Sequence, residues 1–209
     1  MTLPSPAHEG VTVVLVGAFA PTMFHPEWFA RHGLVRPSEA EEAVDAKSVV
    51  LLPDVATVRL GPYGIEVGLD RMVLSVSDRG QAAALRDLGI GVLRRLDVPL
   101  GAMGINAFAH WHARDDFDFA QKAARFSLKA QGSEHLATRL EWQLPALPAT
   151  AEGSSRMLRL ERSVRCAGGV FAQVNTHIAA DRLAATTFLN ERFDEALQAA
   201  DTLLEEVLG

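Results

Sequence analysis

The sequence predicts an α+β fold in which mainly antiparallel sheets carry helices packed on one face. Three observations predict it: several stretches alternate apolar and polar residues, others repeat apolar residues at helical spacing, and turn residues separate neighbouring β-rich stretches. The chain has 209 residues, of which 48% are hydrophobic. That length and composition are sufficient to bury a substantial core.

The first elements are a strand and two short helices. Residues 11–19 are rich in β-branched side chains and apolar on both faces, which is typical of an interior strand. Pro26 suits the first position of a helix and Gly33 the position after its end, so they bracket a short helix. Ser38 and Glu41 have the spacing of a capping box, which predicts a second, acidic helix.

The next segment predicts a hairpin followed by a helix. Two β-rich stretches, 48–60 and 63–76, are separated by Gly61 and Pro62, which indicate a turn. Asp78 can cap a helix whose apolar residues recur at helical spacing until Pro99. The first half therefore has the order β-α-β-β-α.

The second half repeats this order with one additional strand. A strand is expected over 101–111, followed by a helix that Asp115 or Asp116 can cap, that carries Ala130 and that ends before Gly132. Three strands over 137–144, 155–165 and 169–178 and a closing helix complete this half. The tripeptide AFA occurs at 18–20 and again at 107–109. We predict two halves, 1–98 and 99–209, within one compact domain; they are either related repeats or two unrelated α+β units.

Composition excludes several classes of protein. The 20 basic residues stand against 26 acidic ones, a net charge of −6, which makes nucleic acid an unexpected partner. The single cysteine, Cys166, excludes an intramolecular disulfide. We expect a cytoplasmic protein without a membrane partner, because no apolar run is long enough to span a bilayer and residues 1–10 do not resemble a secretory signal. Nucleotide-binding and nucleophile-elbow motifs are absent, so no cofactor and no catalytic residue is predicted.

One pattern suggests a metal site. His110 and His112 are two residues apart on a predicted strand, so both imidazoles can face one cation, and Asp115 or Asp116 can add a carboxylate. The alternative is a strand end followed by an ordinary helix cap, which explains the aspartates without any metal.

Alternation also places polar side chains on one face of the C-terminal strands. Solvated cross-strand ion pairs explain such a face, and a surface that binds a ligand or partner is the alternative. The candidate interaction residues on it are Arg159, Arg165, Asn175 and His177. Arg139, Glu141, Gln143, Glu161, Ser163 and Gln173 share the same alternation.

Three large aromatic residues, Phe24, Trp28 and Phe29, surround the first predicted helix. This helix is too short to be stable alone in water, so its rings must pack against something. They pack either on the chain's own sheet or on a neighbouring subunit, and they are therefore also candidate interaction residues.

Several segments resemble a family of uncharacterised, sporadically distributed bacterial proteins. They are VVLVGAFAP at 13–21, HPEWF at 25–29, IEVGLDRM at 65–72, MGIN at 103–106 and VNTH at 174–177. The resemblance implies no activity. A sporadic distribution implies an association with mobile elements or phage defence.

These observations lead to three hypotheses about function. The first is a non-enzymatic assembly or adaptor component of a bacterial multiprotein system, which binds itself or another protein. The second is a metal-dependent hydrolase or small-ligand-binding protein that uses the strand of His110 and His112. The third, nucleic-acid binding by the arginine-bearing sheet face, is opposed by the net charge.

Overall fold

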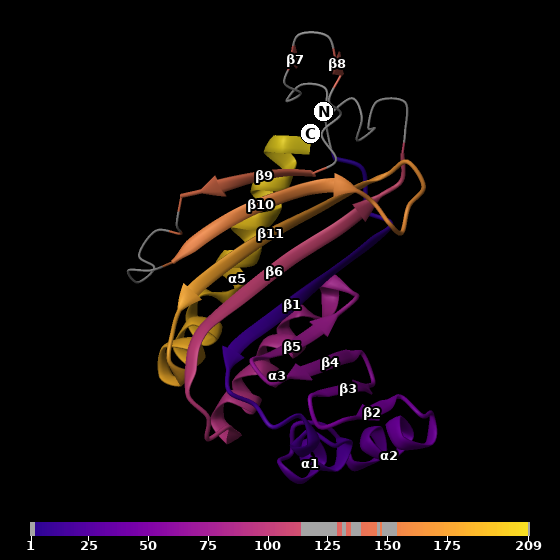
Figure 1. The fold of residues 1–209 in the computed structure, drawn as a ribbon, viewed down its shortest axis with the longest axis vertical. Coiled ribbons are helices and arrows are strands. Elements are labelled where there is room, and N and C mark those ends of the chain that lie inside the picture. Colours follow the sequence, from indigo (N-terminus) through magenta and orange to yellow (C-terminus); the bar gives the residue numbers. More distant parts are fainter. Residues whose placement is uncertain are drawn as a thin grey trace.

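A computed structural model describes residues 3–113, 129–130, 133–134, 139–145, 147 and 154–208. They form a nine-stranded antiparallel sheet with helices on one face, which confirms the predicted α+β class (Figure 1). The strands of this sheet are β1 His8–Gly17, β2 Val49–Leu51, β3 Val55–Leu60, β4 Tyr63–Gly68, β5 Arg71–Val76, β6 Leu100–Trp111, β9 Arg139–Leu144, β10 Ser155–Arg162 and β11 Val170–Ala179. The α-helices are α1 Pro26–Arg31, α2 Pro37–Asp45, α3 Ala82–Arg95 and α5 Arg182–Leu208. Shorter elements are η1 Pro21–Met23, η2 Arg79–Gln81 and a separate small hairpin of β7 Lys129–Ala130 and β8 Ser133–Glu134.

The two halves of the chain share one sheet. The strand order is β2-β3-β4-β5-β1-β6-β11-β10-β9, so β1 and β6 pair at its centre. In that central pair Val11 lies opposite Ala107 and Leu15 opposite Met103. A repeat relationship between the halves stays a prediction.

The core lies between the sheet and its helices. In β1 the side chains of Val11, Val13 and Leu15 are fully buried and alternate with less buried neighbours. Helices α3 and α5 contact each other and the central strands, and Figure 1 shows α5 behind the sheet. The alternation therefore gives every central strand one face toward the helices and one face away from them.

The aromatic segment closes one end of the core. Phe24 and Phe29 are fully buried and Trp28 nearly so, with the ring centroids of Trp28 and Phe29 5.0 Å apart. Pro26 is the first residue of α1 and Gly33 has a positive φ of 67° just beyond it, as predicted. In this chain the three rings face the core, and a contact with a neighbouring subunit stays a prediction.

Three details differ from the predicted elements. The stretches 48–60 and 63–76 are each broken by a tight turn into two strands, because Pro53 and Asp54, and then Leu69 and Asp70, reverse the chain. The second helix begins one residue after Arg36, whose backbone N–H donates to the Glu39 carboxylate, so Ser38 is not the cap. Ala130 belongs to β7 and not to a helix; Asp115, Asp116 and the start of that predicted helix lie outside the described residues.

Among the described residues, no helix combines the length and the apolar character needed to cross a membrane.

Candidate functional site: the open face of the sheet

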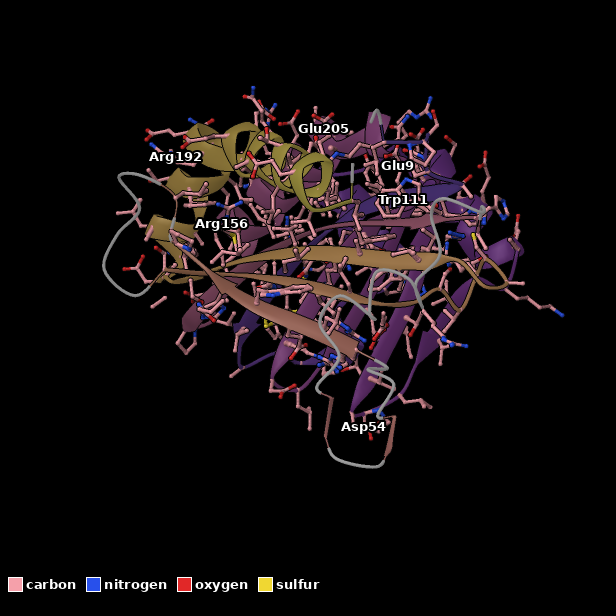
Figure 2. All side chains as sticks on the ribbon, turned by 90° about the horizontal axis from the view of Figure 1, so that it is seen from above. Glu9, Asp54, Trp111, Arg156, Arg192 and Glu205 are labelled. Carbon is pink, nitrogen blue, oxygen red and sulfur yellow. The ribbon has the colours of Figure 1, made fainter. Side chains whose placement is uncertain are left out.

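One face of the sheet carries polar and aromatic side chains and has no described helix over it. We call it the open face, and strand register defines its members. Seen from above, α5 with Glu205 lies on one side of the sheet, and the β2–β3 turn at Asp54 projects on the other (Figure 2). The open face includes Thr12, Thr57, Arg59, Glu66, Arg71, Ser75, Asn106, Phe108, His110, Arg139, Glu141, Arg159, Glu161, Phe171, Gln173, Asn175 and His177.

A row of hydrogen-bonded side chains crosses the centre of the open face. Asn175 Nδ2 donates to Asn106 Oδ1 at 2.5 Å, and Asn106 Nδ2 donates to Thr12 Oγ1 at 2.8 Å. Thr12 is opposite Ser75, whose hydroxyl donates to the carbonyl of Gly64 at 3.0 Å. Asn106 is only 6% exposed, so its two bonds fix the amide and leave Asn175, which is less buried, as the outer member of the row.

A cluster of rings lies beside this row. The centroid of His110 is 4.7 Å from that of Phe171 and 6.4 Å from that of Phe108. The guanidinium carbon of Arg159 lies 5.7 Å from the centroid of Phe171, while its Nη2 contacts Glu161 at 2.6 Å. Phe108 and Phe171 are both partly exposed. The cluster thus presents two partly accessible aromatic rings with an arginine held over one of them.

The hydrogen bonds of His110 fix its protonation state. Its Nδ1 is 2.9 Å from the Ser163 hydroxyl oxygen, which also accepts the backbone N–H groups of Arg165 and Cys166. With those two donors on the oxygen, the hydroxyl proton points to Nδ1, so the imidazole is neutral and carries its proton on Nε2. Burial, reinforced by the charges of Arg165 and His8, lowers the pKa of His110 below the ordinary value of 6.5.

This lowered pKa predicts a stability effect at acidic pH. His110 takes up a proton more readily in the unfolded chain, so its contribution is present above the unfolded pKa of about 6.5 and is lost as pH falls through the lower folded value. Urea unfolding from about pH 7.5 to about pH 5 is expected to show wild-type stability falling more steeply than that of His110→Gln. Parallel curves for the two proteins would contradict the assignment.

A hollow of about 500 Å³ opens in the same face near the opposite edge of the sheet. Lys47, Arg59 and Glu66 bring charges to it, and Ser75 joins it to the polar row. Ser48, Val50, Thr57, Val58, Gly64, Ile65 and Val73 complete its lining. Ser75 occupies space that a side chain at Gly64 would fill, since a Cβ there would lie 2.6 Å from Ser75 Oγ.

The charge of the open face differs in sign from that of the whole chain. Its strand residues include four arginines, at 59, 71, 139 and 159, and three glutamates, at 66, 141 and 161. These charges sum to plus one. Arg139 pairs with Glu141, and Arg159 with Glu161. Many acidic residues lie on α5 instead, among them Asp194, Asp201 and Glu205. The net charge of −6 is therefore not the charge of this surface.

The predicted interaction residues are distributed over three places. Arg159, Asn175 and His177 lie on the open face, as alternation predicts. Arg165 is exposed in the turn between β10 and β11, next to Ser163. Phe24, Trp28 and Phe29 lie in the core near α1.

The structure describes two of the predicted metal ligands, His110 and His112. His110 is 5% exposed and belongs to the ring cluster, whereas His112 is exposed and lies beyond the end of β6. Asp115 lies outside the described residues. Within the part of the chain that the structure describes, no three His, Cys, Asp or Glu residues are grouped so as to hold a metal ion.

Sequence reasoning missed Phe108, Phe171, Lys47, Arg59 and Glu66. Alternation alone places Phe108 on the same face as Asn106 and His110, and Phe171 on the face of Gln173. The positions of both rings could therefore have been predicted from the sequence. The hollow could not be predicted from the sequence, because it depends on how β2 to β5 are placed side by side.

Comparisons with known proteins give little similarity. No family model matches the chain, and no curated protein matches it. A solved structure, that of the rolling circle replication initiator protein from Geobacillus stearothermophilus, aligns with 96% of this chain and 84% of its own, at 8% identity and a TM-score of 0.37. None of these comparisons supports the predicted non-enzymatic adaptor, and since the neighbour found is named as a replication initiator, that prediction is withdrawn. A similarity this low transfers neither fold nor activity to the chain.

Proposed function

We propose that the open face binds single-stranded nucleic acid, by stacking bases on its partly exposed rings and contacting the phosphate backbone with its lysine and arginine side chains. The observation that carries the proposal is the cluster of Phe108 and Phe171 with Arg159 over the second ring. Stacking of bases on aromatic side chains of a sheet is a recurrent way to hold a single strand.

The neighbouring polar residues suit the edges of unpaired bases. Asn175 and Gln173 lie on the same strand face as Phe171, and His177 follows them. Amides both donate and accept hydrogen bonds, as base edges require. Bases in a duplex are stacked on one another and cannot lie on Phe108 or Phe171, so the proposal specifies a single strand.

The distribution of charge removes the objection raised by the overall acidity. Lys47, Arg59 and Arg71 lie on or beside the open face, and none forms an ion pair within the described part of the chain. Carboxylates concentrated on α5 lie on the opposite side of the sheet. On the open face, the three cations without an ion pair among the described residues therefore outnumber Glu66, the strand carboxylate that likewise has none there.

Fluorescence anisotropy with labelled oligonucleotides tests the proposal. We expect a single strand, DNA or RNA, to bind at least about tenfold more tightly than the duplex of the same sequence. With three unpaired cations the logarithm of the affinity should fall against the logarithm of salt concentration with a slope of about −2. The control is Arg94→Gln, which removes one positive charge from the end of α3, on the other side of the sheet.

Equal binding of duplex and single strand would contradict the proposal, and so would an unchanged anisotropy at protein concentrations up to about 100 μM. A slope much steeper than −2 would mean that other cations hold the strand.

A further inference from the structure

We infer that the hollow between β2 and β5 binds the terminal phosphate of the strand that lies on the open face. This inference rests on the proposed function and specifies which end group the surface recognises. Lys47 and Arg59 both line the hollow, and neither pairs with a carboxylate among the described residues. A phosphate monoester offers the doubly charged group that two such cations bind well.

The backbone of Lys47 points to a role for its side chain. Lys47 follows α2 with φ of 53°, the one non-glycine residue with positive φ in the described part of the chain. Its N–H donates to the Val44 carbonyl and that of Ser48 to the Ala43 carbonyl, which is the usual helix C-terminal motif with glycine in this place. A lysine there carries a conformational cost that glycine would not, and no ion pair with another described residue offsets that cost.

The hollow adjoins the polar row of Thr12, Asn106 and Asn175. Ser75 lies opposite Thr12 in the row and also lines the hollow, as do Thr57 and Ser48. From β6, which carries Phe108, to β3, which carries Arg59, the sheet has four interstrand steps. At about 4.8 Å each these span about 19 Å, or about six stacked nucleotides at about 3.4 Å.

One charge in the hollow opposes an anion. The carboxylate of Glu66 lines the hollow together with the two cations, so the site carries a net positive charge of one unit. Removing this carboxylate is therefore expected to strengthen phosphate binding, whereas removing either cation is expected to weaken it. Changes of opposite direction at neighbouring positions separate a phosphate site from general damage to the fold.

Competition anisotropy with unlabelled oligothymidylate tests the inference. For chains of about eight nucleotides, a terminal phosphate at either the 5′ or the 3′ end is expected to raise affinity about tenfold over the matching hydroxyl end. A single nucleotide is too short to reach from Phe108 to the hollow and should show no gain.

Three variants and one control identify the site. Lys47→Gly and Arg59→Gln should abolish the gain from the terminal phosphate, and Glu66→Gln should increase it. Lys47→Gly should unfold at the same or a higher urea concentration than wild type, because glycine is favoured at that φ, so its loss of binding cannot come from loss of fold. Arg94→Gln, with the same change of charge on the helix side, should keep the gain.

The outcomes distinguish this inference from the function on which it rests. If oligonucleotides bind but their terminal phosphate has no effect, or if the effect survives in Lys47→Gly and Arg59→Gln, the inference is wrong and the proposed function stands. If no single strand binds, both are wrong.

Discussion

Replacing both Phe108 and Phe171 with leucine is expected to weaken binding of a single-stranded oligonucleotide by about a hundredfold. Each ring that stacks on a base contributes about 1–3 kcal/mol, so loss of two rings at about 1.4 kcal/mol each corresponds to that factor. Leucine keeps an apolar side chain of similar volume but has no flat π face. The measurement is anisotropy of a labelled single strand at one fixed salt concentration.

The matched control replaces the same two residues with tyrosine. Tyrosine keeps the ring, and both positions are partly exposed, so its hydroxyl can reach solvent. This variant is expected to bind within about threefold of wild type. Equal losses in the leucine and tyrosine variants would show that the rings act through packing and not through stacking.

A second large effect is expected at Phe29. The Phe29→Ala variant should lower the free energy of unfolding by about 3–5 kcal/mol, because the ring is fully buried against Phe24 and Trp28 and alanine leaves a cavity. Urea unfolding monitored by tryptophan fluorescence measures this loss.

Two comparisons show whether the aromatic segment acts within the chain. Met23→Ala, in the same segment but 41% exposed, should change the free energy of unfolding by less than about 0.5 kcal/mol. The loss of unfolding free energy in Phe29→Ala should also be the same at two protein concentrations that differ about a hundredfold, because packing inside one chain does not depend on concentration. A loss of unfolding free energy that grows with dilution would assign the rings to an interface between subunits.

The sheet was largely predictable because its signal is local. Alternation in residues 101–111 and 169–178 identifies both the strands and their two faces, and Gly61 with Pro62 identifies a turn. Within 48–60 and 63–76 the alternation continues up to each turn, so the breaks at Pro53 and at Asp70 were missed. The cap of α2 was missed because Pro37, the residue before Ser38, already occupies the first helical position.

The site was less predictable because it depends on pairing between distant strands. Arg159 and Asn175 could be assigned to a polar face, but nothing local brings Phe108 beside Phe171 or Arg59 beside Lys47. Net charge was also misleading, since a sum over the chain carries no information about which face each charge occupies. The glutamates and aspartates of α5 make the net charge of the whole chain negative, although Arg59 and Arg71 bring positive charge to the open face.

The pairing of β1 with β6 has a consequence for how the protein acquires its structure. Val11 and Ala107 are neighbours in the sheet although about a hundred residues separate them in the chain. During synthesis β1 is made long before β6, so β1 has one unsatisfied edge of ten residues until its partner emerges. We expect folding of this protein to be slow and sensitive to chaperones. Its last step is expected to be the pairing of the free edge of β1 with that of β6.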